Sequence, residues 1–336
     1  MKKETLLSIS ERTGISMTTI SRVLNGKASK YRISKKTAEA VLREVRECGY
    51  QPLMSAQNLR KSQSGLIGLL LPSVSNIFFA EMASGIISEL HSKGYTAIVM
   101  DMMEDPDNLM PSLKALLAHN VEGIIASPCG DSPVLLEKVA EKVPVVLIDR
   151  YFPDSALPYV TTDNFRGGAE GTAELIRFGH RKITCIQGPS NSESNLERVR
   201  GYREMMTAND LEDCIEVTGS EFSIKNGYLE TKLLLAREDR PTAIFALSNM
   251  IFFGVMKAVR EARLRIPDDI SVVSFDDYVF LDYLTPPITR VSQPVDDMAS
   301  LATMMLLDMI KGKREVNSQI KLAPSIVSGK SIRIAE

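Results

Sequence analysis

Cysteine and histidine are scarce in this chain, which has four cysteines and three histidines among its 336 residues. The cysteines show no CxxC spacing and no flanking histidine, so the spacing of a zinc site is absent. Scattered cysteines of this kind are typical of reduced, buried or half-buried thiols in a cytosolic protein. The sequence therefore predicts neither a metal site nor a bound cofactor. The cysteines are Cys48, Cys129, Cys185 and Cys214.

Long apolar runs are also missing. No stretch approaches the roughly 20 residues that a helix needs to span a bilayer. Residues 1–12 lack the apolar segment and the small-residue cleavage site of a secretory signal, so we expect a cytoplasmic protein without membrane contact. With 44% hydrophobic and 24% charged residues, the composition is typical of a globular protein, and the length suits two or three domains.

Catalytic signatures are absent as well. The sequence contains no GxSxG elbow, no P-loop and no HExxH zinc motif. Asp276 and Asp277 form a carboxylate pair, but adjacent residues of a strand point to opposite faces. A glycosidase needs its carboxyl groups roughly 5–10 Å apart across the sugar. We therefore predict that the protein is not an enzyme.

The N-terminal region, in contrast, is strongly basic. Residues 1–62 contain 13 Lys and Arg against 5 Asp and Glu, a net charge of +8. The remaining residues contain 27 basic and 37 acidic ones, a net charge of −10, so the total of −2 hides a basic head on an acidic body. Concentrated positive charge on a small module is typical of a protein that binds the phosphate backbone of nucleic acid.

Residues 5–25 have the pattern of helix, turn and helix. Gly14 permits a tight turn, and the Ser16 hydroxyl can cap the second helix. The outward face of that helix is predicted to be short, polar and Arg-bearing, with Met17, Thr18, Ser21 and Arg22. The pattern alone fits either an ordinary helical hairpin in a core or a helix that enters a DNA major groove, and the local charge favours the second.

A third helix is predicted from about Ser34 to Cys48, with Ser34 as its N-cap and residues 49–52 (GYQP) as its end. Its buried stripe is predicted to contain Ala38, Val41, Leu42 and Val45. Residues 53–64 follow, with a helical pattern only two turns long, which is too short for a stable isolated helix. This segment is either a flexible polar linker or a hinge that becomes helical when bound.

From residue 66 onward, short apolar and β-branched runs alternate with helical patterns. This alternation predicts parallel sheets covered by helices on both faces. The strands are too many for one compact sheet, so we expect two similar α/β lobes. A last helix at 294–311 and a tail at 320–327 could cross back and tie the lobes together. The predicted strands are 66–72, 96–101, 123–128, 144–149, 159–163, 182–188, 242–248, 270–276 and 288–294.

Read together, these features resemble the lactose/galactose-repressor (LacI/GalR) family of bacterial transcription regulators, over essentially the whole chain. The matching stretches are ERTGISMTTISRVLNG, GYQP, SAQNLR, GLIGLLLPSVSNIFFAEMASGI, VVLIDR, TDNFRGGAEGTAELIRFGHRKITCIQGP, ERVRGY, ISVVSFDD and TPPITRVSQP. The resemblance implies an N-terminal three-helix helix-turn-helix DNA-binding domain with a hinge. It also implies an α/β core of two Rossmann-like lobes, similar to the periplasmic sugar-binding proteins, that close over a small molecule.

The resemblance also implies boundaries and an assembly. We expect a head at 1–52, a hinge at 53–64 and a core at 65–336. The first lobe would comprise about 65–162 plus 292–323, and the second about 163–290 plus 324–336. The core would pair into a homodimer that places two heads on a pseudo-palindromic operator. No leucine-heptad tail follows the last strand, so a tetramer is not expected.

By the same resemblance, the DNA contacts are assigned position by position. Met17, Thr18 and Arg22 lie where family members read bases, and Arg22 can bond guanine bidentately. Leu59 matches a leucine that wedges into the minor groove, with Ala56 beside it in the motif. The phosphate-contacting positions are Ser16, Thr19, Ser21 and Asn25, with capping as the other interpretation. The loop at 27–34 is longer than in some members, and Lys30, Tyr31 and Arg32 could add backbone contacts.

The effector residues follow from the same matches. Phe78 and Phe79 lie where family members stack on the effector, although core packing is equally possible by pattern alone. Asp149 ends a strand and can point into a crevice. The other candidates are Arg150, Ser194, Arg198, Phe222, Asn249 and Asp276.

The sequence thus predicts a dimeric transcription regulator, a repressor of a carbohydrate-use operon that responds to a sugar, sugar acid or sugar phosphate. Whether the ligand releases DNA or promotes its binding is open. Two alternatives are a sugar-binding protein without a gene-control role and a sugar-active enzyme. The basic head argues against the first, and the missing catalytic residues argue against the second.

Overall fold

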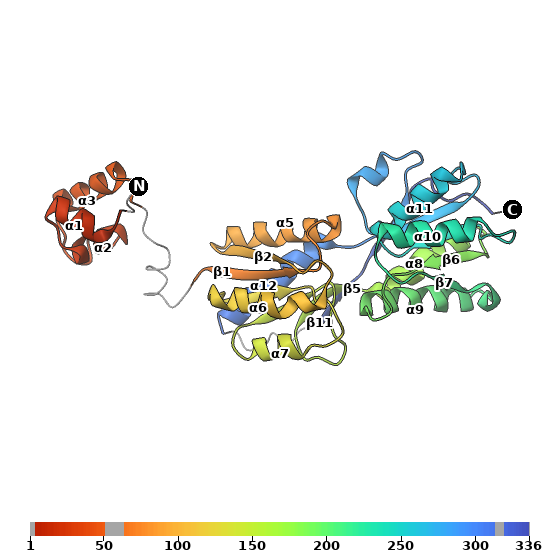
Figure 1. The fold of residues 1–336 in the computed structure, drawn as a ribbon, viewed down its shortest axis with the longest axis horizontal. Helices are drawn as coiled ribbons and strands as arrows, with labels where there is room; N and C mark the ends of the chain where they lie inside the picture. Colours follow the sequence, from red (N-terminus) through yellow and green to blue (C-terminus); the bar gives the residue numbers. More distant parts are fainter. Residues whose placement is uncertain (1–3, 51–63, 313–318, 336) are drawn as a thin grey trace. The chain divides into compact units, whose positions relative to one another are not determined.

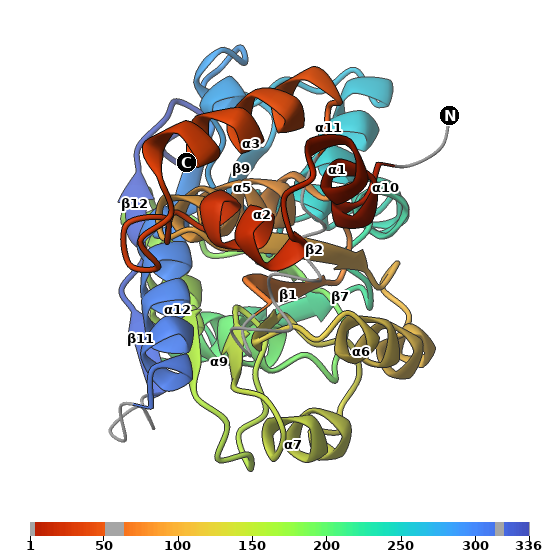
Figure 2. The ribbon, with the colours of Figure 1, turned by 90° about the vertical axis from the view of Figure 1, so that its left-hand side faces the viewer.

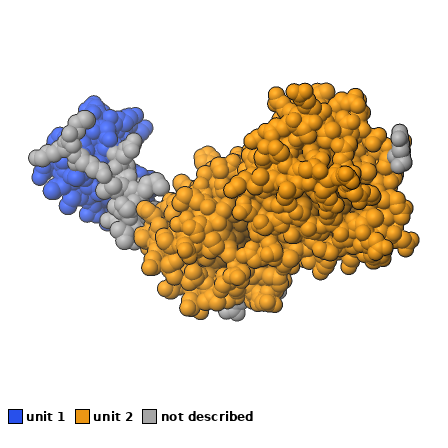
Figure 3. All heavy atoms as spheres, turned by 45° about the vertical axis from the view of Figure 1, so that its right-hand side comes forward, with its two compact units in different colours: residues 1–64 blue, residues 65–336 orange. Residues whose placement is uncertain are grey.

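The computed structural model describes residues 4–50, 64–312 and 319–335 of the chain. The chain divides into two compact units, residues 1–64 and residues 65–336, drawn in different colours in Figure 3. Each unit has its own apolar core and is described by itself. None of the described helices is long and apolar enough to cross a membrane.

Within residues 4–50, the first unit consists of α1 (Leu6–Thr13), α2 (Met17–Leu24) and α3 (Lys35–Glu47), gathered around one another in Figure 2. Each helix begins after a hydroxyl side chain that accepts a backbone N–H, namely Thr5, Ser16 or Ser34. Such caps typically contribute about 1 kcal/mol each. The turn between α1 and α2 passes through Gly14 at φ +68°, a left-handed conformation that suits glycine.

The three helices of the head meet in a small apolar core. Ile9, Ile20 and Val41 are fully buried, one from each helix. The prediction for α3 is wrong at one position, because Leu42 is 43% exposed instead of buried. Consecutive residues of a helix lie about 100° apart around its axis, so Val41 at the centre of the contact leaves Leu42 at its margin.

Six strands of the first lobe form a parallel sheet in the order β11-β5-β4-β3-β1-β2. They are β1 (Leu66–Leu71), β2 (Thr96–Asp101), β3 (Gly123–Ala126), β4 (Val145–Ile148), β5 (Tyr159–Thr162) and β11 (Gln319–Leu322). α5 (Ile77–Ser92) and α12 (Val295–Ile310) cover one face, and α6 (Leu109–Ala118) and α7 (Val134–Ala140) cover the other (Figure 1). Because both faces are covered, the strands are apolar almost throughout.

The second lobe repeats this arrangement, with the sheet order β12-β10-β9-β8-β6-β7. Its strands are β6 (Ile183–Ile186), β7 (Glu216–Thr218), β8 (Ala243–Ala246), β9 (Ser271–Phe275), β10 (Thr289–Ser292) and β12 (Ser325–Val327). α8 (Asn164–Arg177) and α9 (Glu193–Thr207) cover one face, and α10 (Ile224–Leu235) and α11 (Asn249–Glu261) cover the other. The last strand differs between the lobes, since β12 is antiparallel to its neighbour whereas β11 is parallel.

The chain crosses between the lobes three times among the described residues. It leaves the first sheet after β5, returns to the first lobe between β10 and α12, and crosses again between β11 and β12. The last helix therefore packs on the first lobe, against α5 and the strands β3, β4 and β5. The lobes are thus joined by three short connections among the described residues.

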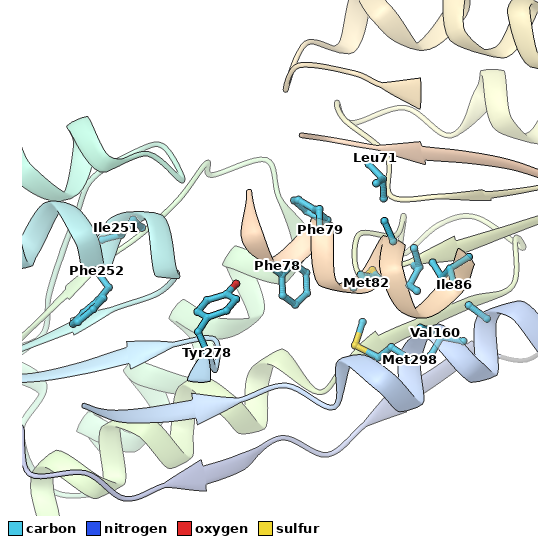
Figure 4. Close-up of a cluster of buried hydrophobic side chains, with 14 of the residues drawn as sticks. Leu71, Phe78, Phe79, Met82, Ile86, Val160, Ile251, Phe252, Tyr278 and Met298 are labelled. Carbon is cyan, nitrogen blue, oxygen red and sulfur yellow. The ribbon is translucent and has the colours of Figure 1, made fainter. Parts of the chain in front are cut away.

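The prediction of two α/β lobes with helix-covered parallel sheets is confirmed, and all nine predicted strands are present. β7 was missed, because it has only three residues and its side chains are half-buried. One apolar cluster runs from the first lobe into the second. Figure 4 shows Phe78 and Phe79 of α5 and Tyr278 of the second lobe where the two parts of this cluster meet.

Candidate functional sites

A cleft lies between the carboxyl ends of the two sheets. Its lining residues follow strands of both lobes, at the sheet edge where doubly wound folds bind their ligands. All nine residues predicted to bind an effector line this one cleft: Phe78, Phe79, Asp149, Arg150, Ser194, Arg198, Phe222, Asn249 and Asp276. Residues that are distant in the sequence therefore converge on one site.

Arg198 is a buried cation in the second turn of α9. Its Nε donates to the side-chain oxygen of Asn164 and its Nη1 donates to the carbonyl of Leu247, both at 2.7 Å. The guanidinium carbon lies 3.7 Å from the ring centroid of Phe275. Burial lowers the pKa of Arg198, while Asp276 and Asp149 oppose this shift. Nη2 makes no hydrogen bond with the described residues, which leaves it available to a ligand.

A glycine sets the position of Arg198. α8 and α9 approach so closely at Gly168 that an added Cβ would lie 2.1 Å from the Arg198 carbonyl oxygen. Any larger residue at this position would push the two helices apart. The glycine in the GGAEG stretch of the sequence thus places a cleft side chain through backbone packing.

Asp149 follows β4 in a left-handed conformation with φ +64° and is 5% exposed. Its Oδ1 is buried and has no hydrogen-bond partner among the described residues. Burial raises the pKa of Asp149 to about 6, against the opposing effect of Arg198 and Arg150. A buried acceptor without a donor is costly, so this oxygen is suited to accept a hydrogen bond from a ligand.

Arg150 lines the cleft, but its charge is already matched. Nη1 and Nη2 donate to the two carboxylate oxygens of Glu104 at 2.9 and 3.0 Å. The guanidinium carbon also lies 5.4 Å from the ring centroid of Phe79. The neighbouring Cys129 thiol is buried, and this burial raises its pKa to about 11, so it remains a neutral thiol. All four cysteines are free.

Both carboxylate oxygens of Asp276 accept hydrogen bonds from other residues that line the cleft. Its Oδ2 accepts the backbone N–H of Asn249 at 2.9 Å, and its Oδ1 accepts from Gln293 Nε2 at 2.6 Å. The Gln293 oxygen in turn accepts from the Thr162 hydroxyl at 2.7 Å. Thr162 and Gln293 lie at two of the three crossovers, so this chain of bonds links the cleft to the connections between the lobes.

A side-chain hydrogen bond joins the lobes directly across the cleft. Asn249 Nδ2 donates to Asn76 Oδ1 at 3.1 Å and lies 3.0 Å from the Tyr278 hydroxyl. The same Asn76 oxygen accepts the Phe78 N–H and so caps α5. On the other side, the Ser194 hydroxyl donates to the Asp149 carbonyl at 3.3 Å. These contacts join the two lobes across the cleft in this structure.

Aromatic rings form the apolar part of the cleft. Phe78 and Phe79 meet edge to face with centroids 5.2 Å apart, and both also belong to the core cluster. Phe222 enters from the second lobe and lies against Gly188, where an added Cβ would be 2.3 Å from the ring. The space left in the cleft is about 30 Å³, close to the volume of one water molecule. A larger ligand requires the side chains or the lobes to move.

The paired aspartates do not share a site. Asp276 faces the cleft, whereas Asp277 accepts a hydrogen bond from the buried Arg290. Arg290 also bonds Asp282 at 2.8 Å and thereby holds the loop after β9. Among residues 4–50, 64–312 and 319–335, no group of His, Cys, Asp or Glu side chains is arranged to hold a metal.

The second candidate site is the outer face of α2 in the head. Met17 is 47% exposed and Thr18 is exposed beside it. Arg22 is half-buried, and its guanidinium carbon lies 3.9 Å from the ring centroid of Tyr31. Asn25 Nδ2 donates to the Ser21 carbonyl at 2.6 Å, which is a capping role at the end of α2. Ser16 likewise caps α2 by accepting the Thr19 N–H.

Residues 5–53 match the family described as bacterial regulatory proteins, lacI family, and residues 172–332 match a periplasmic binding protein-like domain. The chain is 30% identical over 330 residues to the HTH-type transcriptional regulator DegA of Bacillus subtilis, covering 97% of each protein. The chain belongs to the lacI family of bacterial regulatory proteins. This lacI-family protein is therefore a DNA-binding transcriptional regulator and not an enzyme.

Other lacI-family proteins are similar over nearly the whole length. The ribose operon repressor of Haemophilus influenzae is 31% identical over 330 residues, 98% of each chain. Among solved structures, a lac repressor dimer bound to operator and the anti-inducer ONPF superimposes with a TM-score of 0.88 at 27% identity, over 99% of this chain and 100% of that one. The chain thus consists of the same two kinds of unit as the lac repressor, a helix-turn-helix head and a two-lobed α/β core.

The orientation expected for one residue of the lacI-family head is wrong. Ser21 was expected to face outward, but the structure buries it to 9% exposure. It lies beside the buried residues Ile20 and Val23 of α2, a helix of eight residues, at the edge of the inward face. The expected hinge residues Ala56 and Leu59 lie outside the described residues.

Four residues of the cleft were missed, namely Asn76, Ser192, Ser248 and Gln293. Asn76 and Ser248 could have been found, since each is a polar N-cap in the short segment between an apolar strand and the helix that follows it. Gln293 could have been found as well, because it directly follows β10 and ligands meet the carboxyl ends of parallel strands. It lies beside Asp276 because β10 and β9 are neighbouring parallel strands.

Proposed function

We propose that this lacI-family regulator is a cytoplasmic, homodimeric repressor of carbohydrate-use genes, controlled by a neutral sugar bound in the cleft between the lobes. The observation that carries the proposal is the convergence of all nine predicted effector residues on that cleft. The similarity to ribose operon repressors supports a carbohydrate effector. Residues 1–52 would bind DNA, 53–64 would form the hinge, and 65–336 would bind the effector and pair the subunits.

The charges around the cleft favour a neutral effector over a sugar acid or sugar phosphate. Arg150 is paired bidentately with Glu104. Arg198 is buried between Asp149 and Asp276, whose charges both favour its protonated form. The two cations are therefore balanced before any ligand enters. An anionic ligand would have to break these ion pairs, at a cost in free energy. The hydroxyl groups of a neutral sugar can form hydrogen bonds while the ion pairs stay intact, so a neutral sugar binds at a lower cost.

Hydroxyl groups of a sugar match the bonding capacity that remains. The unpartnered Oδ1 of Asp149 would accept from one hydroxyl, and Nη2 of Arg198 would donate to another. Asp276 could accept in place of its bond from Gln293. The rings of Phe78, Phe79 and Phe222 would contact the C–H faces of the sugar.

The proposed switch is a change in the arrangement of the lobes. A ligand shifts this equilibrium only by binding one arrangement more tightly than the other. A sugar too large for a 30 Å³ space would act on the Asn76–Asn249 bond and on the Gln293–Thr162 connection. The change would reach the hinge around Leu59 and alter the grip of the paired heads on DNA.

The homodimer is supported by an apolar hollow on the first lobe. The outer face of α5 and the edge strand β2 line a depression of about 610 Å³. Its apolar lining includes Val74, Ile87 and Val99, which are 45%, 41% and 38% exposed. Exposed apolar patches of this kind mark interaction sites. The related lac repressor structure is a dimer on its operator.

The decisive experiment has two steps. First, selection from random double-stranded DNA with the full-length protein should enrich a two-fold-symmetric site. Second, calorimetry should be run with a panel of neutral pentoses and hexoses and the corresponding sugar acids and phosphates, in the presence and absence of that site. We expect a neutral sugar to bind and to change operator affinity.

Three results would contradict the proposal. Absence of any enriched motif from folded protein would remove the operator. Binding of sugar acids or phosphates, with no neutral sugar active, would show that the balanced arginines open to an anion. An asymmetric operator bound by one subunit would contradict the homodimer.

A further inference from the structure

The two arginines of the helix-turn-helix differ in their bonding. Arg12 of α1 donates to Glu4 and to Glu44, so its guanidinium is held within the head. Arg22 of α2 makes no hydrogen bond or ion pair with the described residues. Among these residues it makes a cation–π contact with Tyr31, whose ring centroid lies 3.9 Å from the guanidinium carbon. None of the five N–H donors of Arg22 is thus used by a described residue, while the guanidinium lies against the Tyr31 ring.

Hydrogen bonds of the backbone hold the loop that carries Tyr31. Tyr31 N–H donates to the Lys27 carbonyl at 3.2 Å, and Lys27 N–H donates to the Arg22 carbonyl at 2.9 Å. The loop is closed at its end by Ile33 N–H, which donates to Ala28 at 2.9 Å. Ala28 and Ile33 both pack against the core of the head. The loop is therefore a hydrogen-bonded extension of α2, and it places Tyr31 where its ring lies against the Arg22 guanidinium.

We propose that Tyr31 is a positioning residue for base recognition, which sets the orientation of Arg22 before DNA is bound. The inference rests on the proposed role of Arg22 as a base reader. A guanidinium that stacks on a ring keeps its donors in its own plane, directed away from the ring. Bidentate recognition of guanine uses two such coplanar donors. The stack limits the rotamers of a long side chain, so less entropy is lost when the base contact forms.

This role differs from the phosphate contact expected for Tyr31 from the sequence. A phosphate contact uses the hydroxyl and affects all sequences alike. A positioning role uses the face of the ring and affects only the base pair that Arg22 reads. Tyr31 is 44% exposed, so its ring can be replaced without opening the core of the head.

The test uses full-length protein and the operator obtained by selection. Arg22→Ala first identifies the base pair that Arg22 reads, as the position where preference is lost. Affinities for the operator and for variants at that base pair are then measured for Tyr31→Ala, Tyr31→Leu and Tyr31→Phe. The alanine and leucine variants should lose discrimination at that base pair by about two- to fivefold, as expected for a cation–π contact at an exposed site. The phenylalanine variant, which keeps the ring, should retain it.

Lys30→Ala is the matched control, because this exposed cation lies in the same loop. It should weaken binding to all sequences alike and reduce the salt dependence, without a change at the Arg22 base pair. Thermal melting checks that each variant is folded, and the leucine variant keeps apolar bulk if alanine destabilises the loop.

The outcomes separate the inference from the function on which it rests. Unchanged discrimination in both Tyr31→Ala and Tyr31→Leu, or an equal loss in Tyr31→Phe, would overturn the positioning role alone. An increase in discrimination would also overturn it, because the stack would then hold Arg22 away from DNA. If Arg22→Ala changes no position, the base-reading role fails, and the positioning role fails with it.

Discussion

The head and the cleft hold their candidate functional side chains in opposite ways. In the head, Met17, Thr18 and Arg22 project from a short helix, and the contact of the Arg22 guanidinium among residues 4–50 is with the Tyr31 ring. In the cleft, Arg198 and Asp276 are buried and bonded to other protein groups. A reading surface needs donors that are positioned but unused, whereas the cleft is a network whose bonds a ligand must join or replace. Mutations should therefore separate the two regions.

The largest effect is expected from Ile20→Ala in the head. Ile20 is fully buried in a core with few other apolar side chains. A truncation of this kind costs roughly 2–5 kcal/mol, and a unit of this size has little stability in reserve. The head should unfold while residues 65–336 remain folded, with loss of operator binding and retention of effector binding. Circular dichroism melts and calorimetry on the same samples measure both.

Glu11→Ala is the control for Ile20→Ala, since Glu11 is exposed on α1. It should change the stability of the head by no more than a few tenths of a kcal/mol. If residues 65–336 of the Ile20→Ala protein remain folded but no longer bind the effector, the stability of the head and the binding of the effector are coupled.

The second-largest effect is expected from Arg198→Met, which changes the cleft and leaves the head intact. The change leaves Asn164 and the Leu247 carbonyl without their donor and leaves Asp149 and Asp276 without a neighbouring cation. We expect a loss of about 3 kcal/mol in the free energy of unfolding of the core. Effector binding should be abolished, while operator binding remains and no longer responds to ligand.

Arg200→Met is the matched control on the same helix. Arg200 forms a surface ion pair with Glu197 and its side chain is 58% exposed, so its loss should be close to neutral. Urea unfolding and ligand titration of both variants test the contrast. A similar stability for the two variants would show that the bonds of Arg198 add little.

The third effect concerns pH. Burial raises the pKa of Asp149 to about 6, above its usual value near 4. The folded state then binds a proton more tightly than the unfolded chain, so this group destabilises the protein as pH rises from about 4 to 6 and by a constant amount above 6. Asp149→Asn should therefore be more stable than the natural sequence at pH 8, by on the order of 2–3 kcal/mol. Asparagine tolerates the left-handed backbone at this position.

The difference in the free energy of unfolding between Asp149→Asn and the natural sequence should shrink as pH falls from 6 to 4. Over this range the Asp149 carboxyl group becomes neutral in both the folded and the unfolded state. Urea unfolding at several pH values measures this difference. A difference that stays constant over this range would show that Asp149 has an ordinary pKa and an unrecognised donor.

The sequence predicted the fold well because its signals are local. Apolar runs such as 66–72 are nearly continuous wherever both faces of a strand are covered, and Ser16 and Ser34 are caps that act within one turn. The errors lie at margins. Ser21 and Leu42 each sit beside the buried stripe of a helix, where one step of 100° separates inside from outside.

The cleft was predicted by position but not by bonding. The strand-end residues Asp149, Asn249 and Asp276 follow from the rule that ligands meet the carboxyl ends of parallel strands. The pairing of Arg150 with Glu104, and the chain from Asp276 through Gln293, join segments that approach only in the folded lobes. No periodicity in the sequence records such contacts, so the balance of charge in the cleft could be read only from the structure.

The smallest effect tests the contact that closes the cleft. Asn76 caps α5 and also accepts a hydrogen bond from Asn249 of the other lobe. Asn76→Ala removes both bonds, whereas Asn76→Ser keeps a good cap and removes only the contact between the lobes. Asn76→Ala should cost about 1 kcal/mol in stability, and Asn76→Ser should recover most of it.

Effector affinity is expected to distinguish the two roles of Asn76. If the effector binds the closed arrangement, both variants should weaken it by a similar factor of a few, because both lose the bond to Asn249. Full recovery of affinity in Asn76→Ser would show that the cap alone matters and that the cleft is closed by other contacts. An increase in affinity in both variants would mean that the effector binds an arrangement in which this bond is broken, so the lobes must open further for the ligand to be held.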